Sequence, residues 1–174
     1  MSRSRVLATL GALALGLSAC GYHPLGGQDT FGPGVHSIEI NAFQNETREP
    51  GLEQLVAEAL NEEFARRGWL KPRLQGEGNT DLVMRGILKT AIYHSSTYSA
   101  SALALEETME VVFDVNVHRM GTSELIWQHP DFHMREQFFS SADPQVFASN
   151  KEQALRRLAS GIAERVHDEL FQRF

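Results

Sequence analysis

The sequence has only one cysteine, Cys20, and this limits how the protein can be held together. A disulfide within one chain is excluded, so the fold must be held by its hydrophobic core. Long apolar runs are scarce as well. The run from Val6 to Leu17 has twelve residues, whereas a membrane-spanning helix needs roughly 20. This run is therefore too short to span a membrane.

The first nineteen residues have the features of a cleaved export signal. Arg3 and Arg5 give a positive start, the apolar run follows, and Leu17-Ser18-Ala19-Cys20 comes directly after it. This tetrapeptide resembles the bacterial lipobox, in which the cysteine is acylated and becomes the first mature residue. We therefore expect a signal peptide over residues 1–19 and lipid on Cys20. The alternative is an ordinary signal peptide followed by an unrelated cysteine.

Basic residues are in the minority, with 16 Lys and Arg against 22 Asp and Glu and a formal net charge of −6. This balance argues against a protein that binds nucleic acid. Residues 20–34 are rich in glycine and contain two prolines, which is typical of a tether. The remaining length is that of one domain. We therefore expect a lipidated tether over residues 20–34 and a single α+β domain over residues 35–174.

Hydrophobic periodicity after the tether alternates between strand and helix patterns. The helix ends are marked by local signals: Glu49-Pro50-Gly51 before the first helix, Arg66-Arg67-Gly68 after it, and Asp143-Pro144 before the second. The predicted elements are a strand at 35–43, a helix at 52–66, a short edge segment at 69–75, long strands at 81–93, 108–120 and 124–139, and a helix from 144 onward.

The middle long strand has one apolar face, and each helix has one apolar stripe. The two helices therefore have one sheet face to cover. We predict a two-layer α+β sandwich, with two helices packed on one face of a mostly antiparallel sheet of four or so strands. Pro130 interrupts the last strand and predicts a bulge or an edge position there.

The motifs of serine hydrolases, P-loop nucleotide enzymes and zinc proteases are missing. Glu106 and Glu107 are neighbours on a strand and would face opposite ways, so they do not converge for acid–base catalysis. His129 and His133 would lie on one face of a strand but roughly 13 Å apart, too far to share a metal ion. We therefore expect no enzyme, no metal and no cofactor.

Two groups of residues are candidates for binding. Residues 94–105 are rich in hydroxyl groups, lack charge when His94 is neutral, and exceed what a tight hairpin needs, which favours a functional loop. A hairpin tip or a continuation of both strands explains the segment equally well. Basic residues at strand level could bind phosphate or simply be solvated. The candidate partner contacts are Tyr93, Ser95, Ser96, Tyr98, Ser99 and Ser101, and the candidate phosphate contacts are Arg85, Lys89, Arg119 and Arg135.

Several short motifs follow one another in register with the lipobox. They are Cys20-Gly21-Tyr22-His23-Pro24-Leu25, Ile38-x-Ile40-x-x-Phe43-x-Asn45-x-Thr47, Glu49-Pro50-Gly51-Leu52-Glu53 and Thr80-Asp81-Leu82-Val83-Met84-Arg85-Gly86. Together they resemble the lipopolysaccharide-assembly lipoprotein LptE family of Gram-negative outer membranes. The likeness covers most of the mature chain. It departs at Asn41, where the family usually has proline, and residues 94–105 lack a basic cluster that matches a lipopolysaccharide contact.

The resemblance implies two helices on a four-stranded sheet and a lipoprotein of the outer membrane, held on its periplasmic side. Gly21 agrees with this location, because aspartate at that position retains many such lipoproteins in the inner membrane. The implied partners are the membrane through the lipid anchor, lipopolysaccharide, and an LptD-like β-barrel that the protein plugs and helps to assemble. The strand motif at 38–47 also occurs in other periplasmic lipoproteins. A curli-secretion pore subunit or a peptidoglycan-synthase activator is therefore the alternative function.

Overall fold

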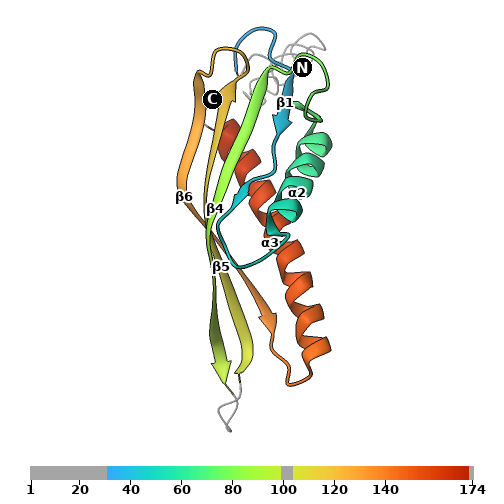
Figure 1. Cartoon of the computed structure of the whole chain (residues 1–174), viewed down its shortest axis with the longest axis vertical. Coiled ribbons are helices and arrows are strands. Elements are labelled where there is room, and N and C mark those ends of the chain that lie inside the picture. Colours follow the sequence, from blue (N-terminus) through green and yellow to red (C-terminus); the bar gives the residue numbers. More distant parts are fainter. Residues whose placement is uncertain (1–30, 99–103, 173–174) are drawn as a thin grey trace, which may run out of the picture.

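Two helices lie side by side on one face of a six-stranded sheet in the computed structural model, which describes residues 31–98 and 104–172 (Figure 1). The molecule is elongated, and α3 runs along much of the sheet whereas α2 covers only one half. The predicted two-layer α+β sandwich is confirmed. The elements in order are β1 (Ser37–Ile40), β2 (Gln44–Asn45), α2 (Leu52–Arg67), β3 (Lys71–Arg73), β4 (Leu82–Tyr98), β5 (Ala104–Arg119), β6 (Leu125–Phe139) and α3 (Pro144–Gln172).

The sheet is larger and more mixed than predicted. Its strand order is β3-β1-β4-β5-β6, and β2 pairs with β4 beyond the end of β1. The β4–β5–β6 part is the predicted antiparallel meander, but β1 is parallel to both β3 and β4. Strand β3 lies within the predicted edge segment at 69–75 and forms one edge of the sheet. The additional strand β2 has only two residues, too few to produce a periodic signal in the sequence.

The β4–β5 hairpin is longer than the sequence predicted. β4 continues to Tyr98 and β5 begins at Ala104, with His94 opposite Thr108 and Thr97 opposite Glu106. Much of the 94–105 segment is therefore sheet, which corrects the interpretation of it as a long loop in favour of continued strands. Residues 99–103 at the tip lie outside the described part. Small and hydroxyl side chains gave no apolar face to mark these strand ends.

The core lies between the helices and the apolar faces of the long strands. Phe113 of β5 is stacked on Phe132 of β6, with ring centroids 4.8 Å apart, and Phe43 packs on Phe113 at 6.4 Å. The predicted apolar faces are confirmed by their burial. Buried members include Met109, Val111, Val115 and Val117 of β5, Val56 and Leu60 of α2, and Leu158, Ile162 and Val166 of α3.

Pro130 lies at a bulge of β6, as predicted. Phe132 pairs with Phe113 and His129 pairs with Val115, so residues 130 and 131 together lie opposite one residue of β5. The extra residue reverses the alternation of side chains along the strand.

The bulge separates the two histidines that the sequence placed on one strand face. His129 faces the helices, with its Nδ1 2.6 Å from Glu169 of α3, whereas His133 faces away, with its Nδ1 2.9 Å from Glu110 of β5. The expectation that both share one face is therefore wrong.

The helix ends follow the predicted signals. Asp143 Oδ1 accepts a hydrogen bond of 2.8 Å from the backbone N–H of Gln145, which caps α3. Gly68 adopts a left-handed conformation with φ 72° after α2, and its N–H donates to Phe64 O at 3.1 Å. No helix in the described part of the chain is both long and apolar enough to cross a membrane.

Candidate partner interface

Both helices lie on one face of the sheet, and the opposite face carries no helix (Figure 1). The strand register places alternate side chains of β4, β5 and β6 on that opposite face. Most of these side chains are polar or charged, and many are half-buried by their cross-strand neighbours. This outer face comprises Arg85, Ile87, Thr90, Ile92 and His94 of β4, Thr108, Glu110, Val112, Asp114, Asn116 and His118 of β5, and Gln128, His133, Arg135 and Gln137 of β6.

Glu110 holds the first charged cluster of the outer face. Its carboxylate accepts hydrogen bonds from Arg135 at 3.1 Å and lies 2.9 Å from the His133 ring nitrogen. Arg135 and then His133 lower the pKa of Glu110 to about 2. The predicted phosphate contact Arg135 is therefore already paired with a carboxylate.

Lys89 joins three strands in a second cluster. Its Nζ lies 2.7 Å from Asp114 and 2.9 Å from Asp131, and the backbone N–H of Asp131 donates to Asp114 at 2.8 Å. Asp114 and then Asp131 raise the pKa of Lys89. Burial opposes the ionisation of Asp114, but Lys89 and the Asp131 N–H outweigh it and lower its pKa. The Lys89 charge is thus compensated within the sheet.

The other two predicted phosphate contacts differ from each other. Arg119 is 2.9 Å from Glu124 and also donates to the carbonyl oxygen of Phe31 at 3.1 Å, so it fastens the start of the described chain. The Arg85 side chain is exposed and has no ion pair or hydrogen bond within the described residues. It lines a hollow of about 450 Å³ together with polar groups that include Asn116 and His118. Arg85 is therefore the available cation among the four.

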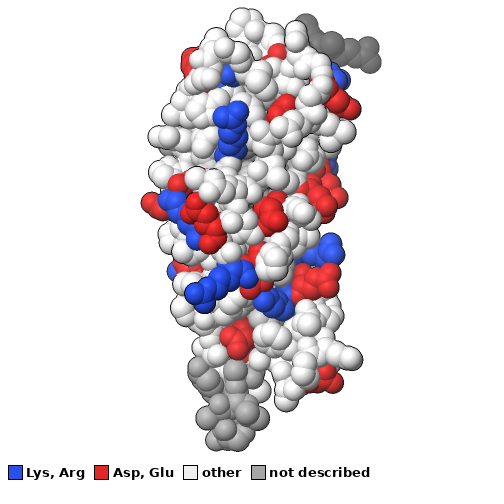
Figure 2. All heavy atoms as spheres, viewed as in Figure 1, with Lys and Arg blue, Asp and Glu red and all other residues white. Residues whose placement is uncertain are grey.

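The structure does not bring the four basic residues together. Arg85 lies opposite Asn116 of β5, whereas Arg135 lies opposite Glu110, six residues away along the same strand. That separation is roughly 20 Å. Figure 2 shows basic and acidic side chains interspersed on one side of the molecule, without a large area of one sign.

Tyr93 points toward the helices rather than outward. Its ring packs edge-on against Phe138 at 6.3 Å, and Lys151 Nζ of α3 lies 4.8 Å from the ring centroid. Burial and the neighbouring Glu49 carboxylate raise the pKa of Tyr93 above its usual range. Much of the ring is thus occupied by the core, and the contact of Tyr93 with a partner stays a prediction.

The predicted serine contacts are described only in part. Ser95 Oγ donates to the Glu107 carboxylate at 3.2 Å, on the helix side of the sheet. The side chains of Ser96 and Tyr98 and all of Ser99 and Ser101 lie outside the described part. Cys20, the signal peptide and most of the tether also lie outside it.

Sequence reasoning missed the carboxylates that neutralise the outer face, Glu110, Asp114 and Asp131. The alternation of Glu110 and Asp114 marks them as outward-facing, but their cationic partners depend on strand register. Within the described residues, no group of three or more His, Cys, Asp or Glu side chains is placed to hold a metal ion. The arrangement offers paired charges and hydrogen-bonding groups on a broad surface, which suits contact with another macromolecule.

Proteins of known structure share this α+β sandwich with helices on one face of the sheet. A crystal structure described as a lipoprotein of Caulobacter crescentus CB15 is similar with a TM-score of 0.54 and 10% identity, over 75% of this chain and 89% of that one. A Chlamydia trachomatis protein is similar with a TM-score of 0.50 and 10% identity, over 78% and 98%. At such identity these likenesses show the fold alone. A comparison with curated protein sequences finds no match.

The family is shown by the sequence itself. The model of the LptE family, described as lipopolysaccharide-assembly, matches residues 35–170. The chain therefore belongs to the LptE family, which confirms the resemblance found in its motifs.

Proposed function

We propose that this protein is an outer-membrane lipoprotein, anchored through Cys20, that plugs the LptD β-barrel translocon and assists lipopolysaccharide transport to the outer leaflet. The family match over residues 35–170 is the observation that carries this proposal. It implies association with the lipopolysaccharide transport machinery. The anchor, the barrel and the role as a plug are the finer parts of the proposal, and they rest on the lipobox and on the character of the outer face.

The outer face supports insertion into a barrel because the interior of a large barrel is polar and wet. A surface that enters such a space loses bulk water, and an unpaired charge there is costly. Glu110 and Lys89 each have opposite charges within 3.1 Å, so their charges are compensated before any partner is bound. The neighbouring Asn116, Gln128 and Thr108 supply hydrogen-bonding groups.

Arg85 is our candidate contact for a lipopolysaccharide phosphate. Its guanidinium has no partner in the described part of the chain, and the hollow beside it also contains Asn41, Gln44 and Asn116. A guanidinium binds phosphate through charge-assisted hydrogen bonds. Lys89, Arg119 and Arg135 serve ion pairs instead, so we expect Arg85→Gln to weaken lipopolysaccharide binding more than Arg135→Gln.

The proposal is tested by purifying the tagged full-length protein from detergent-solubilised outer membranes. We expect an LptD-like barrel to co-purify, and we expect Cys20→Ser to release the protein from membranes. Gln128→Trp adds a bulky group to the outer face, whereas Ser160→Trp adds the same group to the exposed side of α3. Loss of the barrel with the first variant alone would place the interface on the sheet. Failure of the wild-type protein to bind any barrel would refute the function, and purification as a ring or with a peptidoglycan synthase would favour the alternative.

A further inference from the structure

A basic cleft of about 660 Å³ lies at the end of the molecule where the described chain begins. It is bordered by the start of β1, the end of α2, strand β3 and the segment before β4. Three cationic side chains line it within seven residues of sequence: Arg67, Lys71 and Arg73. The rest of the wall includes Trp69, His36 and Asp81. A cluster of cations is unexpected in a chain whose formal net charge is −6.

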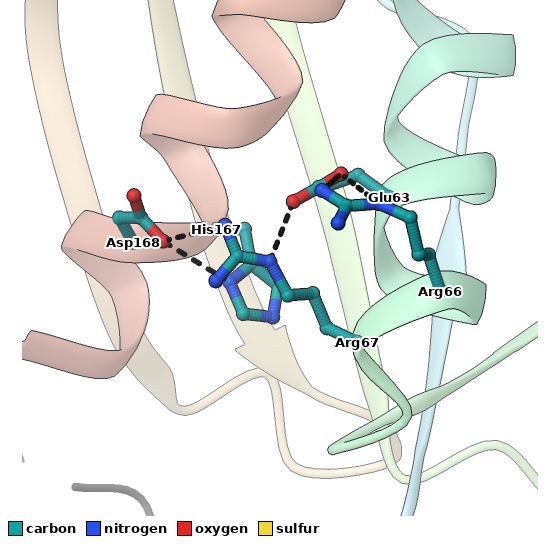
Figure 3. A network of polar contacts seen from close by, with 5 residues as sticks. All are labelled: Glu63, Arg66, Arg67, His167 and Asp168. Carbon is teal, nitrogen blue, oxygen red and sulfur yellow. Dashed lines mark hydrogen bonds and ion pairs between the residues drawn. The ribbon is translucent and has the colours of Figure 1, made fainter.

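The carboxylates near the cleft form no ion pair with Lys71 or Arg73, although the buried Glu39 of β1 lies opposite Arg73 in the strand register. Asp81 is the carboxylate in the wall, and it accepts hydrogen bonds from the backbone N–H groups of His36 and Ser37 and from the Ser37 hydroxyl. Arg67 is paired with Glu63 at 2.7 Å and with Asp168 of α3 at 3.2 Å. Figure 3 shows how these pairs join the ends of α2 and α3.

The side chains of Lys71 and Arg73 have no hydrogen bond or ion pair within the described residues, whereas most Lys and Arg side chains there are paired. They alternate on β3, the outermost strand of the sheet, so both project to the same side at the molecule's edge. Pro72 between them has no N–H to offer to a further strand. The edge of β3 therefore presents two free cations to whatever lies beyond it.

Two apolar side chains are exposed beside these cations. Trp69 is 39% exposed although its ring packs on Phe171 at 6.0 Å, and Leu74 is 69% exposed. A tryptophan and a leucine flanked by lysine and arginine are typical of a surface that lies at a membrane interface. The cations meet lipid phosphates there, and the apolar groups enter the headgroup region.

The attachment of the segment that leads to Cys20 favours a membrane lipid as the ligand of the cleft. Phe31 is fixed at this end of the molecule, with its ring 5.2 Å from that of Phe171 and its carbonyl bound by Arg119. Gly34 lines the cleft three residues later. Phe31 is only eleven positions after Cys20, and a chain of this length spans at most about 39 Å. The cleft is thus at the end of the domain to which the segment leading to Cys20 is attached.

We propose that this cleft binds the phosphate headgroup of an anionic phospholipid in the leaflet that holds the lipid anchor, through Lys71 and Arg73. The proposal rests on the proposed anchor for bringing the cleft to the bilayer. Binding a headgroup there would fix the orientation of the sandwich relative to the membrane.

Trp69 provides the measurement, because Trp127, the other tryptophan, is only 3% exposed. The acylated full-length protein would be placed on vesicles of phosphatidylcholine alone or with added phosphatidylglycerol, and acrylamide quenching would be measured. We expect the quenching constant of Trp69 to be about two- to threefold lower on the anionic vesicles. About 1 M salt shortens the Debye length to roughly 3 Å and should remove this difference.

In the Lys71→Gln/Arg73→Gln double variant, the anionic vesicles should no longer protect Trp69 from acrylamide quenching. Arg48→Gln/Arg156→Gln is the matched control, since it removes two exposed cations elsewhere on the surface and leaves the cleft intact. The proposal would be overturned if Trp69 of the wild-type protein were quenched equally on both vesicle types. It would also be overturned if both double variants lost the protection of Trp69 to the same extent. Protection by inorganic phosphate alone would overturn the lipid assignment. Failure to float with either vesicle would refute the anchor, whereas flotation without protection would refute the cleft.

Discussion

Ser37 and Asp81 are joined by two reciprocal hydrogen bonds. The Ser37 hydroxyl donates to Asp81 Oδ2 at 2.7 Å, and the backbone N–H of Asp81 donates to the same hydroxyl oxygen at 3.1 Å. Asp81 Oδ2 also accepts the backbone N–H groups of Ser37 and His36, each at 2.9 Å. These bonds connect the start of β1 with the residue before β4, 44 positions later.

We expect Asp81→Ala to lower the free energy of unfolding by about 1.5–3 kcal/mol, because backbone donors lose a charged acceptor. Burial opposes the ionisation of Asp81, but the bonds from His36 and Ser37 outweigh it and lower its pKa from 3.8. The carboxylate therefore stabilises the fold above its unfolded pKa, and this contribution is lost as the pH falls below about 4.

Urea unfolding of the wild-type protein and the Asp81→Ala variant at several pH values tests this assignment. The difference in stability should be full near neutral pH and should shrink in acid. The control is Glu58→Ala, on the exposed side of α2. A difference between wild type and Asp81→Ala that stays constant from neutral to acidic pH would contradict the role of the carboxylate.

Asn45 connects β2 to the beginning of α2 through both ends of its amide. Its Oδ1 accepts the backbone N–H of Thr47 at 2.9 Å, and its Nδ2 donates to Glu49 O at 2.8 Å and to the Glu53 carboxylate at 2.5 Å. We expect Asn45→Asp to cost about 1–3 kcal/mol, because a carboxylate would replace the donor and face Glu53. Adding Glu53→Gln should restore part of that loss. A double-mutant cycle from urea unfolding measures the coupling, and additive effects would argue against this contact.

Local signals predicted the helices and the long strands well. Asp143-Pro144 and Arg67-Gly68 mark helix ends through groups within a few residues, so no knowledge of the rest of the fold is needed. The apolar alternation from Met109 to Val117 identified the buried face of β5 in the same way. The strand ends at 94–98 and 104–107 were missed because their sequences, HSSTY and ALEE, have no apolar alternation.

The candidate sites could not be assembled from the sequence, because they depend on strand register and bulges. Glu110 and Arg135 are 25 residues apart, and only the pairing of β5 with β6 brings them together. Pro130 predicted a bulge, but the reversal of faces that separates His129 from His133 requires the partner strand. The cleft was missed because β3, which carries Lys71, is only three residues long.

Gly86 of β4 and Gly161 of α3 provide a matched pair of glycine substitutions. A Cβ on Gly86 would lie 2.3 Å from the Phe43 ring and 2.7 Å from the backbone oxygen of Asp114, so we expect Gly86→Ala to cost about 1–3 kcal/mol. A Cβ on Gly161 would meet only the terminal methyl of Met134 at 2.3 Å. This flexible group can move, and alanine is favoured in helices by about 1 kcal/mol.

Gly161→Ala should therefore be neutral or stabilising, and thermal or urea unfolding of both variants provides the comparison. Equal effects of the two substitutions would show that close approach of Phe43 to β4 is not required for stability.

His167 of α3 is buried between aromatic rings, 5.0 Å from Phe64 and 4.5 Å from Phe171 by ring centroid. Its ring nitrogens have no hydrogen-bond partner in the described structure, and the nearest carboxylate, Asp168, is 3.7 Å from Nδ1 (Figure 3). Burial and the nearby Arg67 lower the pKa of His167 below 6.5 and outweigh the opposing effects of Asp168 and Glu63. The neutral ring is thus the form that the fold accepts.

We expect the stability contributed by neutral His167 to be complete above about pH 6.5 and to be lost as the pH falls from there toward the folded pKa. The slope can reach about 1.4 kcal/mol per pH unit, because the unfolded chain binds a proton that the folded one does not. His167→Phe should remove this slope, and His167→Leu provides a smaller side chain in case phenylalanine overpacks the site. The control is His36→Gln, on an exposed histidine. Urea unfolding across this pH range is the measurement, and a slope that persists in both His167 variants would assign it to another group.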